Sequence, residues 1–162
     1  MSPAVVSVRA IQESDLQSVR AFLQQEAGAT SFVSRGRLHE ANRLPGFAAF
    51  FDDNLVGVLN YRVDGYEMEI VTIYASVHRR GVGTALMNAA REAAHRIGAR
   101  RIWLITTNDN LPAISFYKRQ AFRLVAVHKG AVEESRKLKP EIPLYGIAGA
   151  PITDELEFEA VP

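Results

Sequence analysis

The sequence predicts a single mixed α/β (α+β) domain in which helices flank a mixed sheet. Strand-like and helical runs alternate in the order β-α-(α)-β-β-β-α-β-α-β-β, which is typical of this class. Three of the strand-like runs follow one another with short polar turns between them, as in an antiparallel meander. The 162 residues are 48% hydrophobic, and no repeat or linker divides them. We therefore expect residues 1–162 to form one domain with its own core.

The first elements are a strand and a helix. Residues 5–10 alternate apolar and polar side chains, as a half-buried strand does. Ser14 and Gln17 have the spacing of a capping box, which predicts a helix start, and Gly28 is a stop signal. The apolar face of this helix is formed by Leu16, Val19, Leu23 and Ala27. Residues 29–46 could hold a second short helix, although their arginine and glycine content argues against one.

Residues 47–75 give the clearest local prediction. Strand-like runs cover residues 47–51, 55–63 and 66–75. Asp53-Asn54 and Asp64-Gly65 separate them, and Asp-Gly is a strong signal for a two-residue hairpin. The third run is nearly apolar throughout, as expected of a central strand that is covered on both faces.

The second half of the chain alternates helices and strands. A long helix follows a glycine-containing turn and ends at Gly98, with a core face of Leu86, Ala90, Ala93 and Ile97. A strand at 101–106, a short helix at 111–120 and a strand at 122–129 come next. The tail is predicted to hold a turn of helix at 131–138, a Pro/Gly-rich excursion at 140–151 and a last strand near 156–161.

The turn before the long helix is a candidate phosphate site. Its residues are His78-Arg79-Arg80-Gly81-Val82-Gly83. The first amides of a helix lack internal partners and carry the positive end of its dipole, and glycines let a phosphate approach them closely. A tight turn with no ligand is the alternative. A P-loop is excluded because its lysine motif is absent, and a Gly-x-Gly-x-x-Gly fingerprint is excluded because position 86 is Leu.

These residues resemble the GNAT superfamily of acetyltransferases, whose turn motif is Gln/Arg-x-x-Gly-x-Gly/Ala. His78 stands where Gln or Arg is usual. A second motif of the family, Asn-x-x-Ala-x-x-Phe/Leu-Tyr-x-x-x-Gly-Phe, matches in register at Asn110, Ala113, Phe116, Tyr117 and Phe122. Ala121 replaces its usual glycine, at a helix end where a positive φ favours Gly. The resemblance covers residues 5–129 and extends to the last strand.

The resemblance implies a GNAT-like fold with a mostly antiparallel central sheet, acetyl-CoA as acyl donor and N-acetylation of a primary amine. The acceptor would be a small molecule, and the transfer would be direct. The implied cofactor-binding residues are the main chain of Ile73, Tyr74 and Ala75, the turn residues Arg79, Arg80, Gly81, Val82, Gly83 and Thr84, and then Asn110, Ala113 and Tyr117. Asn110 could instead serve only as a helix cap.

Tyr117 is the predicted general acid. A phenol stays protonated at neutral pH and can donate a proton to the departing thiolate, although a tyrosine on an amphipathic helix can also be a core residue. Glu67 and Glu69 are the candidate bases, and period-two geometry places both on one face of the strand. Glu69 is preferred because it lies nearer the apolar interior, but either carboxylate could simply be solvated.

Two basic clusters could recognise an anionic acceptor or the 3′-phosphate of CoA, or could be solvated surface. The first comprises Arg35, Arg37, His39 and Arg43, and the second Arg136, Lys137 and Lys139.

No metal-ligand spacing is present, and the chain has no cysteine for a disulfide or a thiol nucleophile. Peptide or protein N-acetylation and a non-catalytic acyl-CoA sensor remain as alternative functions.

The composition bounds the partners. A net charge of +1 and a pI near 8.1 disfavour a nucleic-acid binder. No run of about 18 apolar residues predicts a membrane span. The N-terminus has no basic region followed by a long apolar stretch, so we expect no secretory signal and a cytoplasmic location. A homodimer is an open possibility.

Overall fold

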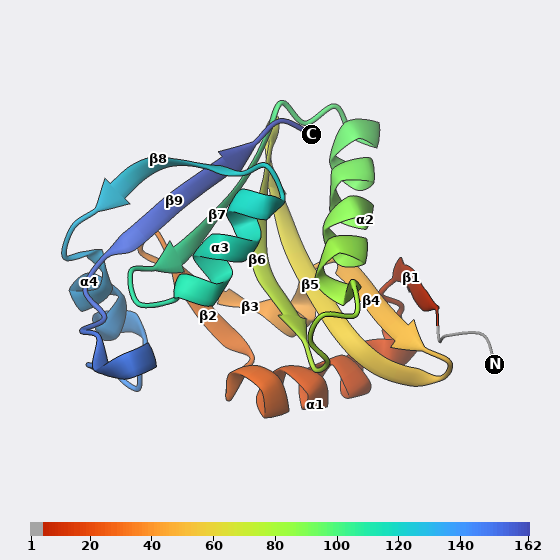
Figure 1. Cartoon of the computed structure of the whole chain (residues 1–162), viewed down its shortest axis with the longest axis horizontal. Helices are drawn as coiled ribbons and strands as arrows, with labels where there is room; N and C mark the ends of the chain where they lie inside the picture. Colours follow the sequence, from red (N-terminus) through yellow and green to blue (C-terminus); the bar gives the residue numbers. More distant parts are fainter. Residues whose placement is uncertain (1–4) are drawn as a thin grey trace.

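The alternating runs of the sequence form a seven-stranded sheet with the order β1-β4-β5-β6-β7-β9-β8, in a computed structural model that describes residues 5–162 (Figure 1). β6 and β7 are parallel, and the other neighbouring strands of this sheet are antiparallel. The predicted mixed, mostly antiparallel sheet is therefore confirmed. The segment in which no secretory signal was expected begins with residues 1–4, which lie outside the described residues.

The bounds of the elements follow the predicted order, with one hairpin added. The strands of the large sheet are β1 (Val6–Ala10), β4 (Gly46–Phe51), β5 (Asn54–Asp64), β6 (Glu67–Ala75), β7 (Arg101–Thr107), β8 (Arg123–His128) and β9 (Glu155–Ala160). β2 (Ser31–Ser34) and β3 (Arg37–Glu40) form a second, two-stranded sheet. The helices are α1 (Leu16–Ala27), α2 (Val82–Arg96), α3 (Leu111–Arg119) and α4 (Ala131–Leu138).

Two cores cover the two faces of the sheet. α2 and α3 lie in front of the sheet in Figure 1. On this face, apolar side chains of the helices pack against Leu59, Met68 and Ile70 of the sheet in the larger core. On the opposite face, Val58 packs against Val19 and Leu23 of α1 in a smaller core. Successive residues of β5 thus point to opposite faces, as the strand period requires. β6 is covered on both faces, as its apolar sequence predicted.

The start of α1 differs from the prediction. The Ser14/Gln17 capping box does not form; instead, the Asp15 carboxylate accepts a hydrogen bond from the backbone N–H of Gln12 at 2.8 Å. The Arg9 guanidinium donates to both oxygens of this carboxylate. Leu16, predicted on the core face, is the first residue of α1 and is 39% exposed, so it is not a core residue.

Residues 29–46 contain no second α-helix, so that prediction is wrong. Arg35 and Gly36 both have positive φ, of 49° and 73°, and turn the chain into the β2–β3 hairpin. A short 3-10 turn at Ala41–Arg43 follows before β4. The arginine and glycine content that weakened the helix prediction marks the turn of this hairpin.

The predicted meander is present as β4, β5 and β6. Asp64 and Glu67 pair across the Gly65 turn. The pairing of β5 with β6 shifts between Asn60 and Tyr61, which leaves Val71 of β6 as an extra, bulged residue. Buried Thr72 and Asn60 bond one another next to the bulge, where the Thr72 hydroxyl donates to Asn60 Oδ1 at 2.8 Å.

The last strand of the tail, β9, is an inner strand of the large sheet and not an edge strand. β9 inserts between β7 and β8, so the last strand of the chain lies inside the sheet. The predicted turn of helix at 131–138 is confirmed as α4. The excursion after it is tied down by buried Asp109, whose Oδ2 accepts from the Ile147 N–H at 3.2 Å.

The residues that follow α2 and α3 bear on two predictions, that Gly98 ends α2 and that Ala121 replaces a glycine after α3. Gly98 takes φ +74° and ends α2 as predicted, but Ile97 is the C-cap and is 53% exposed, so it is not a core residue. Ala121 takes φ +66° immediately after α3. A Cβ in this left-handed region costs about 1–2 kcal/mol, which is the strain expected where the family motif has Gly.

We expect Ala121→Gly to stabilise the protein by about 0.5–1 kcal/mol, because the relieved strain exceeds the added flexibility of the unfolded chain. Thermal unfolding would show a rise of roughly 1–4 °C. The matched control is Ala89→Gly within α2, where the backbone is helical and the same change should destabilise by about 0.5–1 kcal/mol. Equal destabilisation by both substitutions would contradict the strain at Ala121.

Candidate active site

The parallel strands β6 and β7 separate halfway along their length. They pair in register from Glu67 and Arg101 to Ile70 and Leu104. Beyond that point β6 pairs only with β5, and β7 pairs only with β9. The Val71 bulge lies where the strands part. A cavity of about 290 Å³ opens between the diverging strands, and residues 69–74 and 105–107 line it.

Three hollows join into one groove along this opening, which we call the splay groove. The cavity at Glu69 shares Ile73, Tyr74, Ala113 and Tyr117 with a hollow of about 240 Å³. That hollow shares Ala75, His78, Gly83 and Phe116 with a third one of about 680 Å³ around the glycine turn. The splay groove therefore runs from the N-terminus of α2, along the free edge of β6, to Glu69.

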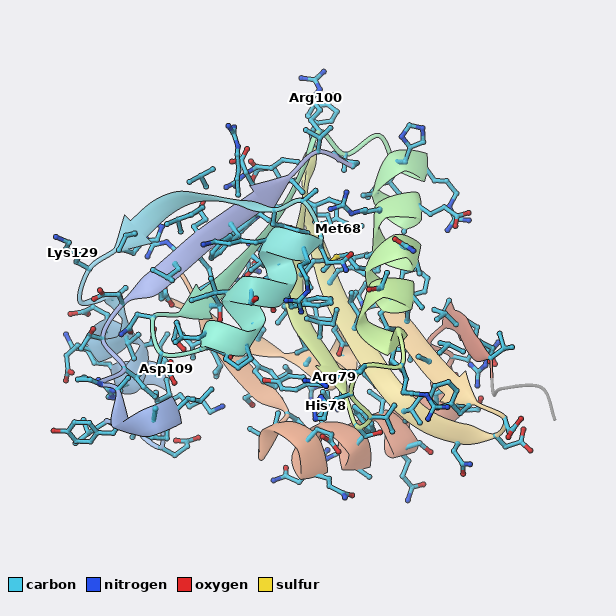
Figure 2. All side chains as sticks on the ribbon, viewed as in Figure 1. Met68, His78, Arg79, Arg100, Asp109 and Lys129 are labelled. Carbon is cyan, nitrogen blue, oxygen red and sulfur yellow. The ribbon has the colours of Figure 1, made fainter. Side chains whose placement is uncertain are left out.

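The glycine turn presents free backbone amides at the outer end of the splay groove. Arg79 and Gly81 both adopt positive φ, of 58° and 76°, and the first helical bond of this turn runs from the Ala85 N–H to the Gly81 carbonyl. The N–H groups of Val82, Gly83 and Thr84 thus have no acceptor within α2. In Figure 2, His78 and Arg79 lie near the end of β6, and both are exposed.

The two glycines of the turn are required for different reasons. Gly81 provides the left-handed backbone and has open space where a Cβ would be. A Cβ on Gly83 would lie 3.0 Å from the ring of Phe116, so Gly83 allows α2 and α3 to approach closely. The second motif therefore packs directly on the first. Arg80 lines the hollow at the glycine turn, and its guanidinium lies 5.1 Å from the ring centre of Phe51.

Tyr117 lies at the junction of the cavity and the middle hollow. Its ring packs against Phe116, Phe122 and Phe158 at centre distances of 5.6, 6.1 and 6.2 Å. Burial, and to a smaller degree Tyr74, raises the pKa of Tyr117, so the phenol stays protonated. Among residues 5–162, every side-chain nitrogen or oxygen atom that is fully buried has a hydrogen-bond partner. The Tyr117 hydroxyl, for which no bond is found, therefore opens toward the groove.

The two candidate bases are in different surroundings. Glu67 is exposed, lies 3.5 Å from the guanidinium of Arg101 and does not line the cavity. Glu69 is 2% exposed and lines the cavity. Arg62 Nε donates to Glu69 Oε1 at 2.6 Å, and the Ser34 hydroxyl donates to Oε2 at 2.6 Å. The structure thus brings only Glu69 of this pair into the cavity.

His39 is the residue whose place the sequence least indicated. It was grouped with exposed arginines, but it is buried, with Nε2 2.9 Å from Ser34 Oγ and 4.0 Å from Glu69 Oε1. The pKa of His39 lies below its ordinary value, chiefly because the ring is buried. The charge of Glu69 opposes this shift, whereas Arg62 and Arg37 add to it. Only the unexpected β2–β3 hairpin brings it here. The sequence held no signal for this burial, because alternation in this strand would place apolar Leu38, rather than His39, on the buried face, whereas Leu38 is exposed.

Asn110 and Ala113 begin α3 at the groove. The Asn110 side chain accepts from the Ala113 N–H at 3.3 Å, so Asn110 caps α3. Asn110 also lines the cavity, where its remaining polar atoms can meet a ligand. Asp109, labelled in Figure 2 beside the start of α3, is directed instead to the tail.

Most residues of the basic clusters have structural partners or face solvent. Arg35 binds buried Glu155 at 3.1 Å, and Arg136 donates to the carbonyls of Ile142, Pro143 and Ile152. Lys137 pairs with Glu134, while Arg37 and Arg43 are exposed. Lys139 differs because it lines the cavity, with Nζ donating to the Ser31 carbonyl at 2.6 Å. Burial lowers the pKa of Lys139, although Glu141 and Glu40 raise it.

Within residues 5–162, no group of three or more His, Cys, Asp or Glu side chains could hold a metal ion. No helix in that range is long and apolar enough to cross a membrane.

Free helix amides, an unpaired strand edge and a cavity with a carboxylate and a phenol are features that suit an acyl-CoA-dependent transferase domain. The chain matches the Acetyltransferase (GNAT) family over residues 8–122, and it belongs to this family. The sequence-based identification is confirmed.

Individual relatives support this assignment. The chain is 38% identical over 139 residues to the uncharacterized protein YxbD of Bacillus subtilis (strain 168), covering 85% of this chain and 87% of that protein. It is 32% identical over 115 residues to a streptothricin acetyltransferase of Streptomyces lavendulae, covering 68% of this chain and 55% of that protein. A Bacillus subtilis acetyltransferase in complex with CoA shares the fold, with a TM-score of 0.68, 18% identity and 99% of each chain covered.

Acetyl-CoA is the acyl donor of this family, and the splay groove fits it. The amides of the glycine turn suit a pyrophosphate. The unpaired edge of β6 at residues 73–75 suits the amide-bearing pantetheine arm, which can bond to it as an added strand does. The reactive end of such an arm would lie near Tyr117, where the hollows join.

Proposed function

We propose that this protein is an acetyl-CoA-dependent N-acetyltransferase that acts on a primary amine of a small molecule by direct transfer. The observation that carries the proposal is that Glu69 and Tyr117 line one cavity at the inner end of the splay groove. A base and an acid on either side of the thioester are the two groups that direct transfer needs.

The donor is assigned to the outer and middle parts of the splay groove. The main-chain amides of Gly81, Val82, Gly83 and Thr84 bind the pyrophosphate, with Arg79 and Arg80 adding positive charge. Ile73, Tyr74 and Ala75 bond the pantetheine arm through their main chain. Asn110 and Ala113 close the other side of the arm. The Val71 bulge frees a strand amide that can polarise the thioester carbonyl.

The proton balance assigns the two side chains. The acceptor arrives as an ammonium with three N–H bonds and leaves as an amide with one. Its nitrogen forms the new C–N bond as the C–S bond of the thioester breaks. One proton goes through Glu69, directly or by a water, to solvent, and the Tyr117 hydroxyl protonates the departing thiolate and is then reprotonated by the second ammonium proton. Its raised pKa keeps Tyr117 in the acid form.

A small acceptor is favoured over a peptide by the cavity itself. The cavity measures about 290 Å³ and is lined in part by Phe32 from the hairpin and by Lys139 and Ile142 from the tail. This is the lower end of the size range of small-molecule sites. The relative in Streptomyces lavendulae is named for streptothricin, a small molecule, which is consistent with this choice.

The experiment is a thiol-release assay with acetyl-CoA and a panel of amines: lysine, spermidine, an aminoglycoside, streptothricin and a peptide with a free N-terminus. We expect turnover with at least one small amine and a kcat within the ordinary enzyme range of about 1–1,000 s⁻¹. Calorimetry with acetyl-CoA on the same protein measures donor binding separately.

The outcomes distinguish the candidate functions. Turnover of the peptide alone would move the assignment to peptide N-acetylation. Donor binding with no turnover on any amine would favour an acyl-CoA sensor. Absence of donor binding by the wild-type protein would contradict the proposal altogether.

A further inference from the structure

Each carboxylate oxygen of Glu69 accepts one hydrogen bond from the protein, which holds the group in place and leaves further lone pairs for a proton. Arg62 occupies Oε1 and Ser34 occupies Oε2, each at 2.6 Å, and the side chain is 2% exposed. Arg62 is needed to balance a buried negative charge. Ser34 belongs to the β2–β3 hairpin, 35 positions away in the sequence, and is itself 8% exposed. The hairpin therefore contributes to the surroundings of the proposed base.

The direction of the hydrogen bonds in this cluster can be derived. A serine hydroxyl has one hydrogen, and Ser34 donates it to Glu69. Ser34 Oγ can then only accept at its second contact, the 2.9 Å contact with His39 Nε2. His39 Nε2 must therefore carry a hydrogen. Burial lowers the pKa of His39, which favours the neutral ring, and in the neutral ring a hydrogen on Nε2 leaves none on Nδ1.

We propose that Ser34 and His39 form a positioning dyad for Glu69, in which His39 fixes the Ser34 hydroxyl and Ser34 fixes the carboxylate for proton abstraction. This inference rests on the proposed function of Glu69 as the base. Neither residue has an assigned role in the reaction, and neither touches the reacting atoms in it. The dyad would make the hairpin part of the catalytic apparatus as well as a wall of the cavity.

The dyad predicts a specific effect of His39 protonation. The charged groups that act on His39 come from three strands: Glu69 of β6, Arg62 of β5 and Arg37 of β3. Protonation at Nδ1 would add a positive charge to a ring whose Nε2 lies 4.0 Å from Glu69 Oε1. A positive charge there stabilises the carboxylate and lowers its affinity for the amine proton. Activity should therefore fall on the acid side when His39 becomes charged.

The test uses the pair His39→Gln and His39→Leu. A glutamine amide places an N–H close to the position of Nε2 but cannot acquire charge, whereas leucine has similar bulk and no donor. With acetyl-CoA and the panel amine that gives turnover, we expect His39→Gln to keep kcat near pH 8 and His39→Leu to lose roughly tenfold. Ser34→Ala should lose a similar factor. The KM for acetyl-CoA should stay unchanged in all three variants, because the dyad lies away from the donor part of the groove.

The ratio of wild-type to His39→Gln kcat across pH 5–8 separates positioning from a structural role. We expect the ratio to be near one at pH 8 and to fall below one as the pH decreases, since only the wild type gains the charge. Titration of the acceptor amine cancels in this ratio. A constant ratio, or equal kcat for the Gln and Leu variants, would overturn the inference.

A measurement that needs no acceptor completes the test. Nitrogen-15 NMR of the imidazole in wild-type protein should show His39 neutral with hydrogen on Nε2, and Ser34→Ala should shift that resonance. If Glu69→Gln were as active as wild type, the base assignment would fail while the tautomer remained. If Glu69→Gln were inactive and the dyad variants were unaffected, only the dyad would fail.

Discussion

Gly83→Glu is expected to weaken acetyl-CoA binding by more than a hundredfold. The substitution places a carboxylate among the free amides at the N-terminus of α2, where the donor pyrophosphate is assigned. Two like charges forced together cost several kcal/mol, and each 1.4 kcal/mol corresponds to a factor of ten. Calorimetric titration with acetyl-CoA measures the effect directly.

The control for this change must account for the packing of Gly83. Because a Cβ at this position meets Phe116 at 3.0 Å, any substitution pushes α2 and α3 apart slightly. Gly83→Gln has the same size as Gly83→Glu without the charge, so both should lower the melting temperature equally. We expect the Gln variant to bind acetyl-CoA more tightly than the Glu variant. Wild-type affinity in both would show that the donor does not use this turn.

Tyr117→Phe is expected to lower kcat by about a hundredfold or more, with little change in the KM for acetyl-CoA. The ring remains in its aromatic cluster with Phe116, Phe122 and Phe158, so only the hydroxyl is lost. Tyr74→Phe is the matched control, because Tyr74 lines the same cavity and burial also raises its pKa. That variant should lose only a few-fold. A larger loss in Tyr74→Phe than in Tyr117→Phe would transfer the acid role to Tyr74.

The raised pKa of Tyr117 has a consequence on the alkaline side. An acid is active while protonated, and a raised pKa extends the protonated form to higher pH. The wild-type kcat should therefore show no loss from phenol ionisation up to about pH 10, the ordinary pKa of tyrosine. A decline of kcat near pH 9 that disappears in Tyr117→Phe would contradict this environment.

The parts of the fold predicted from the sequence are those set by local patterns. Period-two and period-3.6 repeats located the meander, α2 and α3, and Gly81 and Gly98 marked the two ends of α2. Periodicity did not predict the structure correctly where a segment was short and compatible with more than one element. Residues 29–46 lacked a clear period, and the β2–β3 hairpin depends on two positive φ angles at Arg35 and Gly36. Ile97 matched the helical period but lay one residue past the helix.

Some residues of the candidate site were likewise indicated by the sequence, whereas others were located only by the tertiary structure. The sequence alone pointed to the glycine turn, to Tyr117 and to the pair Glu67 and Glu69, because these residues lie in contiguous segments that resemble the family motifs. It could not place Ser34 and His39 beside Glu69, since that contact closes 35 residues of chain through an unpredicted hairpin. It preferred Glu69 to Glu67 but could not exclude Glu67, because the two residues share a strand face. Only the tertiary structure separates them, because Glu67 lies in the paired part of β6 beside Arg101, whereas Glu69 borders the place where β6 and β7 part.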